Sequence, residues 1–361
     1  MLLGGRPHRQ IDGEQITFRT GHGPRRQANR CDVFTKVAPG YLGALNFERG
    51  PMTKQKTGIA WVALAAALWG TDALFRRGLA LELPAATVVF FEHIVLVALT
   101  LPWLLRSRKI VANLGAGDLV SLFLIGAGAS ATATILFTAA FSYGDPNTPL
   151  LLQKLQPLVA VLGARLLLGE ALLSRYWLFL VAGLGGAYLI AFPDPLQVSV
   201  SQLAPALLAV GAAALWGMGT VLGRRLSARL EFRELTAWRF AIGMPVAGLI
   251  WLMRAGPPVG VSGGQDVLAI VVLALVPGLG AMLIYYRGLS RTPASAATIA
   301  ELAFPLSAAA VNYLAFGAVL TASQWTGMLI LAGAITWMSL LGSQDPEEVG
   351  VVAETSLAPG T

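Results

Sequence analysis

Four ionisable residues lie well inside long apolar segments of the sequence, where they could bind a charged substrate or couple its movement to an ion. Glu92 and Lys154 each follow by eight residues the proline that opens their segment, whereas Arg239 and Glu301 lie five and seven residues into theirs. At 1.5 Å per helical residue, these positions are about 8–12 Å from a segment end. Ionisable groups at membrane depth are costly and are functional candidates by default.

The signs and depths of these four residues predict two ion pairs. Glu92 is expected to partner Lys154 in the outer half of the membrane, and Arg239 to partner Glu301 in the inner half. Each pair would lower the penalty of an unpaired charge in the membrane. One interpretation is that the pairs bind substrate or gate its passage alternately from the two sides. The other is that they are structural ties between helices.

Two prolines lie near polar residues in a matching pattern. Pro157 and Pro305 each remove the hydrogen bond to the carbonyl four residues earlier, which belongs to Gln153 and Glu301 respectively. Irregular backbone at membrane depth is tolerated only where protein or a water-filled cavity satisfies it. The spacing therefore predicts two kinked helices that form cavity walls, although prolines also occur in membrane helices without any transport role.

Other polar residues in the apolar segments have both functional and structural interpretations. His93 can titrate near neutral pH and, with Glu92, couple transport to protons, or it is a hydrogen-bonded packing residue. Asp72 lies four residues before Arg76, a spacing that allows a same-face pair within one helix. Glu170 is interpreted as an architectural residue at a helix end. Five aromatic residues either line a cavity or anchor the protein at the membrane interface: Trp69, Trp216, Trp238, Tyr285 and Tyr286.

The elements that must hold these residues follow from the composition. Of 361 residues, 55% are apolar and only 12% are charged, whereas an average soluble domain has about 25% charged residues. Too little polar surface remains to cover a soluble globule, so we predict an integral membrane protein whose surroundings are the lipid bilayer. The single cysteine, Cys31, excludes an internal disulfide or a cysteine-based metal site. More than half of the +7 net charge comes from the first 51 residues, which removes the case for nucleic acid.

Ten apolar segments of about 18–25 residues are long enough to cross a bilayer core of about 30 Å. They are residues 58–80, 84–104, 118–141, 147–168, 174–192, 202–222, 234–254, 265–288, 294–317 and 322–341. The predicted inside loops carry ten Lys or Arg residues and the outside loops only Arg76, Arg77 and Arg254, which predicts cytoplasmic N- and C-termini.

Residues 1–57 are expected to be a disordered basic extension, either a cytoplasmic tail or the result of a start that belongs near Met52. Residues 342–361 are expected to be a disordered tail.

The chain repeats itself with an offset of about 147 residues. The sequence Ala-Leu-Trp-Gly occurs at 67–70 and again at 214–217, and Pro157 aligns with Pro305 when the offset is one residue longer. Each unit holds five predicted helices, and because five is odd, the second unit must enter the membrane from the opposite side. Inverted repeats of this kind underlie alternating access in many secondary transporters. The two predicted units are residues 58–192 and 202–341.

These motifs resemble those of the drug/metabolite transporter superfamily, and in particular its ten-helix EamA-type permeases. The resemblance rests on Ala-Leu-Trp-Gly at the start of each repeat, on Gln156-Pro157-Leu158 leading to Leu168-Gly169-Glu170, and on the glycine-rich segments 183–188 and 331–335. The chain departs from the family pattern at Phe316-Gly317-Ala318 and at Glu92-His93. The resemblance implies an all-α membrane protein of ten helices in two inverted five-helix repeats. It also implies export of amino acids, other metabolites or toxic compounds across a bacterial inner membrane.

The sequence features bear on three classes of function. A secondary transporter of a small-molecule substrate, working by alternating access, is favoured by the repeat, the kinks and the buried charges, and an amino acid would find partners for both of its charges. The sequence has no Walker-type phosphate loop, so ATP use is not expected. A lipid or polyprenyl-phosphate flippase is the alternative, with Lys154 and Arg239 as its basic residues. A membrane-embedded enzyme is disfavoured because no catalytic constellation, cofactor motif or metal motif is visible.

Overall fold

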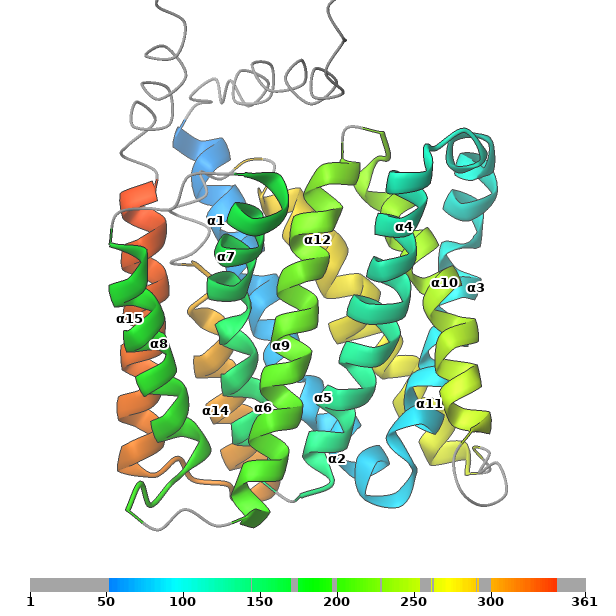
Figure 1. Cartoon of the computed structure of the whole chain (residues 1–361). Helices are drawn as coiled ribbons and strands as arrows, with labels where there is room; N and C mark the ends of the chain where they lie inside the picture. Colours follow the sequence, from blue (N-terminus) through cyan, green and yellow to red (C-terminus); the bar gives the residue numbers. More distant parts are fainter. Residues whose placement is uncertain are drawn as a thin grey trace, which may run out of the picture. The chain divides into compact units, whose positions relative to one another are not determined.

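The computed structural model describes a bundle of α-helices (Figure 1). The described residues are 52–143, 145–169, 175–196, 200–227, 229–253, 261, 263–289, 291 and 300–342. In the first repeat the elements are α1 (Met52–Gly70), α2 (Asp72–Glu82), α3 (Ala85–Ala112), α4 (Ala116–Leu124), η1 (Ile125–Thr132), α5 (Ala133–Phe141), α6 (Asn147–Leu152), η2 (Gln153–Leu155), α7 (Gln156–Leu168) and α8 (Tyr176–Ala191). In the second repeat they are α9 (Val200–Leu226), α10 (Phe232–Leu252), α11 (Gly264–Leu273), η3 (Ala274–Gly280), α12 (Ala281–Leu289), α14 (Ala303–Phe316) and α15 (Ala322–Gly342).

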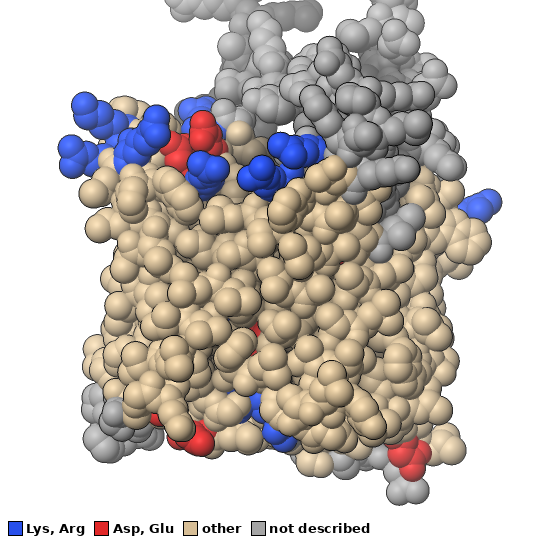
Figure 2. Space-filling view, turned by 180° about the vertical axis from the view of Figure 1, so that it is seen from behind, with Lys and Arg blue, Asp and Glu red and all other residues tan. Residues whose placement is uncertain are grey.

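These elements combine into ten membrane segments. Within the described ranges, eight helical stretches are long and apolar enough to cross a membrane, and two shorter apolar helices, α8 and α14, complete the set. Figure 2 shows the consequence on one face, where a broad band almost free of charged side chains lies below a cluster of Lys and Arg at one end. The chain is therefore an all-α, multi-pass membrane protein, as its composition predicts.

The two repeats share irregular backbone at equivalent places. The third segment of each repeat contains a π-helical stretch, η1 or η3. The fourth segments, of which α7 and α14 form the C-terminal parts, both end at a glycine with left-handed backbone, Gly169 at φ 71° and Gly317 at φ 63°. Glycine takes this conformation without the penalty that a side chain would bring. Because these features recur 148 or 149 residues apart, they support the duplication seen in the sequence.

Two helix pairs form the most extensive contacts between segments, α3 with α10 and α8 with α15. In Figure 1, α8 and α15 lie side by side at one edge of the bundle, and α3 and α10 lie together near the opposite edge. Small residues permit close approach in such pairs. A side chain at Gly126 in η1 would collide with Ile242 of α10, and one at Gly186 of α8 would collide with the Gly327 backbone of α15. The small-residue segment 126–134 thus serves helix packing.

Two sequence expectations need correction. Helix α1 begins at Met52, inside the segment predicted as an extension. Lys and Gln are good helix formers, so the helix continues beyond the apolar stretch. Arg76 does not lie in an outside loop but in α2, where it is buried, because carboxylates within the membrane segments neutralise it. The predictions for residues 1–51, Glu170, Arg254 and the tail after Gly342 lie outside the described residues.

Candidate functional site

The fourth and ninth membrane segments are interrupted at equivalent positions. In the fourth, the α-helix gives way to a 3₁₀ turn at Gln153–Leu155 and resumes as α7, which carries Pro157 in its first turn. In the ninth, residues 301–302 form a turn before α14 begins, and Pro305 lies in the first turn of α14. Proline cannot donate the backbone hydrogen bond that would hold it to the preceding turn. Each interruption therefore places polar side chains beside irregular backbone within the membrane.

A polar cluster joins the two interruptions. The Nζ atom of Lys154 lies 3.7 Å from the Oε2 atom of Glu301. The hydroxyl of Tyr285 donates a hydrogen bond to the other Glu301 oxygen at 2.6 Å. The ring of Tyr285 lies 5.1 Å from the ring of Trp69, between centroids, and the Lys154 ammonium lies 4.4 Å from the centroid of Phe304. Four membrane segments thus contribute to one cluster that offers a cation, an anion and aromatic faces.

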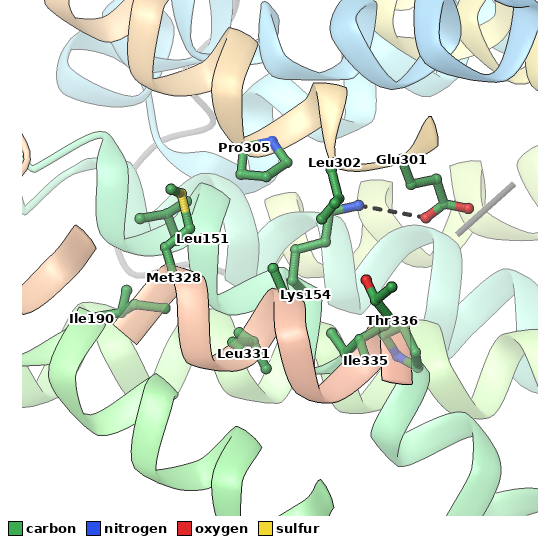
Figure 3. A pocket seen from close by; sticks show the side chains of 12 residues that line it. Leu151, Lys154, Ile190, Glu301, Leu302, Pro305, Met328, Leu331, Ile335 and Thr336 are labelled. Carbon is green, nitrogen blue, oxygen red and sulfur yellow. Dashed lines mark ion pairs between the residues drawn. The ribbon is translucent and has the colours of Figure 1, made fainter. Parts of the chain in front are cut away.

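A cavity of about 40 Å³ adjoins this cluster. Lys154, Glu301, Pro157 and Pro305 line it, together with residues of α8 and α15 (Figure 3). The Oγ1 atom of Thr336 in the cavity wall is buried and makes no hydrogen bond among the described residues. The side chains of Lys154 and Glu301 are 24% and 28% exposed. The cavity has room for a few water molecules, so these polar groups are accessible to a small ligand once the walls separate.

A second polar cluster is centred on Arg76. Its guanidinium donates two hydrogen bonds to Asp72, at 2.6 and 3.0 Å, and two to Glu92, at 3.2 and 3.3 Å. A fifth goes to the hydroxyl of Thr138 at 2.8 Å. Arg76 and Glu92 are each 4% exposed. All five N–H hydrogens of the guanidinium are therefore satisfied by α2, α3 and α5, which the cluster ties together.

His93 makes hydrogen bonds with both ring nitrogens and is 2% exposed. Its Nδ1 atom lies 2.8 Å from the carbonyl oxygen of Val89, which can only accept, so Nδ1 carries a hydrogen. The Nε2 atom lies 3.0 Å from the hydroxyl of Ser130 and accepts from it when the ring is neutral. These contacts favour the packing interpretation of His93.

The other candidate residues, Arg239, Gln153 and Trp216, make no polar contact with Lys154 or Glu301 among the described residues. Arg239 donates to the carbonyl of Ala129 at 3.2 Å, and its Nε atom is buried without a partner among the described residues. Gln153 is half-buried within the 3₁₀ turn. Trp216 packs edge-on against Phe137, with ring centroids 5.1 Å apart.

The two ion pairs predicted from the sequence are wrong. Glu92 pairs with Arg76 rather than with Lys154, and Glu301 pairs with Lys154 rather than with Arg239. Both predicted pairs rest on opposite charge and equal depth in the membrane. Depth does not determine which helices are neighbours. The fourth and ninth segments occupy equivalent places in the two repeats and meet at their interruptions, and this contact brings Lys154 to Glu301. By contrast, the predicted same-face pair of Asp72 and Arg76 is present.

Sequence reasoning missed the hydroxyl groups of Thr138 and Thr336 and did not identify the partner of Ser130. Thr138 completes the Arg76 cluster, Ser130 holds His93, and Thr336 faces the cavity. Hydroxyl residues are frequent in membrane helices, where they also bond to their own backbone. Their type alone therefore gave no signal, and only the positions of neighbouring helices identify them.

Comparison with known proteins places these features in a family. The profile of the EamA-like transporter family matches this chain twice, over residues 56–192 and 203–340. The riboflavin transporter ImpX of Fusobacterium nucleatum is 31% identical over 79% of this chain and 98% of its own length. A riboflavin transporter of Brucella anthropi is 22% identical over 71% of this chain and 88% of its own length. The uncharacterized inner membrane transporter YicL of Salmonella typhimurium is 23% identical over 80% of this chain and 97% of its own length.

One solved crystal structure has a related fold. It covers 81% of this chain and 100% of its own chain, with a TM-score of 0.55 and 18% sequence identity. At this identity the similarity concerns the fold alone.

Proposed function

This chain belongs to the EamA-like transporter family, and from that premise we propose that its substrate is riboflavin or a close flavin analogue. The observation that carries the proposal is the similarity to two riboflavin transporters, one of them matched over nearly its whole length. We propose that transport proceeds by alternating access, for which the inverted repeat provides two equivalent halves.

The Lys154–Glu301 cluster offers the chemistry that such a substrate needs. Riboflavin has a flat aromatic ring system with amide-like hydrogen-bonding edges and a polyhydroxyl side chain, and it is uncharged at neutral pH. The rings of Trp69 and Tyr285 supply faces for stacking. Lys154, Glu301 and the hydroxyl of Thr336, which has no partner among the described residues, supply donors and acceptors. The cavity of about 40 Å³ is too small for a flavin, so binding requires the segments to move at the interruptions.

An amino acid is the second candidate. Lys154 and Glu301 present opposite charges beside one cavity, and a zwitterion has a complementary charge for each. An amino acid would then break the pair and bind both partners, whereas a flavin would leave the charges paired and use their hydrogen-bonding capacity. Competition between the two compounds separates these proposals.

For the location we propose the inner membrane of a bacterial cell, with both ends of the membrane region cytoplasmic. The similarity to an inner membrane transporter supports the location. Arg225 near the end of α9 and Arg229 in the loop before α10 support the orientation because Lys and Arg collect on the cytoplasmic side. We propose export as the direction, and a dependence of transport on the pH gradient would identify protons as the coupling ion.

Flavin fluorescence provides the test. Purified protein is titrated into riboflavin, and the expected result is saturable quenching that excess alanine or glutamate does not reverse. Proteoliposomes loaded with riboflavin are then diluted into buffers of different pH, and export coupled to protons predicts release that depends on the pH gradient. Absence of quenching, combined with thermal stabilisation of the protein by an amino acid, would overturn the flavin proposal in favour of the zwitterion.

A further inference from the structure

A second and larger hollow lies on the outer face of α8 and α15. It has a volume of about 390 Å³ and is lined mainly by apolar side chains of these two helices, with Arg175 at one end. Its lining residues on α15 include Leu329, Gly333 and Trp337. None of its lining residues is shared with the cavity beside Lys154, which uses other positions of α15. This groove is therefore separate from the candidate substrate site.

Part of the groove is open because the residue at its floor, Gly333, has no side chain. A Cβ atom added to Gly333 would meet no other atom within 4 Å, so the space above this residue is open. The walls around it are apolar and exposed, with Leu178, Leu329 and Trp337 at 68%, 65% and 60%. On a helix pair at the edge of a membrane bundle (Figure 1), such a surface faces lipid tails rather than water. An acyl chain is the occupant whose shape and polarity fit it.

Arg175 gives the groove a charged end. It lies immediately before α8 and has no ion-pair partner in the part of the chain that the structure describes. A guanidinium binds phosphate through parallel hydrogen bonds. Basic pockets between membrane helices on the cytoplasmic side bind anionic lipid headgroups. At the offset of 148 that relates Pro157 to Pro305 and Gly169 to Gly317, the counterpart of Arg175 is Ser323, so the inverted counterpart of this end lacks the cation.

We propose that this groove binds an anionic phospholipid, with one acyl chain lying over Gly333 between α8 and α15 and the phosphate group at Arg175. The groove has an apolar channel with a cation at one end. A phospholipid has the matching arrangement, with an apolar acyl chain and an anionic phosphate group at one end. The proposal is independent of the identity of the transported substrate.

The test uses the full chain and phospholipids of matched acyl chains. Purified protein is exchanged into detergent containing equal amounts of phosphatidylglycerol and phosphatidylcholine, and retained lipid is measured by native mass spectrometry. We expect the wild-type protein to retain phosphatidylglycerol in preference. Gly333→Leu fills the groove and should abolish the preference. Gly185→Leu is the matched control, because Gly185 is exposed on α8, does not line the groove and also has open space above it.

The headgroup contact is tested separately. Arg175→Ala should reduce the preference for phosphatidylglycerol about fivefold, the effect of one basic residue near the membrane surface. Arg108→Ala removes another exposed arginine and should leave the preference unchanged. Equal retention of the two lipids by the wild type, or an unchanged preference in Arg175→Ala, would overturn the proposal. So would a wild-type dimer that Gly333→Leu converts to a monomer without loss of lipid, because the groove would then hold a second copy of the chain.

Discussion

The Arg76 cluster and the Lys154–Glu301 pair both hold charges within the membrane, but in different ways. Arg76 is 4% exposed and its guanidinium makes five hydrogen bonds within regular helices. Lys154 and Glu301 lie 3.7 Å apart, are about one-quarter exposed, and lie where two helices are interrupted beside a cavity. A saturated cluster has no capacity left for a ligand, whereas a looser pair can exchange one partner for a substrate group.

Comparison of the two repeats also separates the Arg76 cluster from the region of Lys154 and Glu301. At an offset of 147, Asp72, Arg76 and Glu92 correspond to Gly219, Gly223 and Arg239, so the cluster exists in one repeat only. The helix interruptions, in contrast, occur in both repeats. Alternating access, the mechanism proposed above, requires two halves that can exchange roles, and only features common to both repeats can serve it in both halves. We infer that the Arg76 cluster holds the first repeat together while the interruptions carry the movement.

The largest expected effect comes from breaking the saturated cluster. Arg76→Ala leaves the carboxylates of Asp72 and Glu92 buried without their cation, and removal of one partner of a buried ion pair costs about 3–5 kcal/mol. We expect this variant to lose most of its folded yield and to melt at a much lower temperature. Thermal melting in detergent, followed by tryptophan fluorescence and size-exclusion chromatography, measures the change.

A compensated variant provides the control for this prediction. When Asp72→Leu, Arg76→Met and Glu92→Leu are combined, no charge is left unpaired, and apolar replacement of a whole buried cluster is often neutral for stability. Recovery of folding together with substrate binding would show that the cluster is structural. Folded protein that no longer binds riboflavin would instead assign the cluster to transport and would contradict the comparison.

The next effect concerns the looser pair. Lys154→Met and Glu301→Gln each remove one charge beside the cavity, and we expect riboflavin binding to weaken about tenfold, the equivalent of about 1.4 kcal/mol. Lys154 and Glu301 are each about one-quarter exposed, so the unpaired partner is less buried than in the Arg76 cluster, and the melting temperature should fall less than in Arg76→Ala. Fluorescence quenching measures binding, and thermal melting of the same samples measures stability. A large loss of stability with unchanged binding would reverse the roles of the two regions.

The sequence predicted the elements well because hydrophobic length and proline act locally. Ten apolar segments, the internal repeat and the same-face pair of Asp72 and Arg76 all follow from spacing along one helix or between equivalent helices. The positions of Pro157 and Pro305 coincide with the observed interruptions for the same reason, since a proline acts on its own helical turn.

The partners across helices could not be predicted in this way. Equal depth predicts Lys154 as the partner of Glu92, yet the partner in the structure is Arg76, from α2 of the same repeat. Lateral contacts depend on which helices pack together and on their rotation. Small residues such as Gly126 and Gly186 permit the close approach of a neighbouring helix, with which a side chain at either position would collide. Depth and charge restrict the choice of partners without deciding it.

The smallest effect tests whether the hydroxyl of Tyr285 belongs to the looser region. Tyr285→Phe keeps the ring beside Trp69 but removes the hydrogen bond to Glu301, and a hydrogen bond to a charged group contributes about 1.5–3 kcal/mol. Only part of this is expected in binding, about a threefold to tenfold weakening, because the freed carboxylate can turn toward Lys154 or water. Tyr286→Phe is the matched control, since the ring of Tyr286 stacks on Phe232 and its hydroxyl has no described bond to Glu301. Equal riboflavin affinities for the two variants would remove Tyr285 from the site and leave Lys154 and Glu301 as its polar groups.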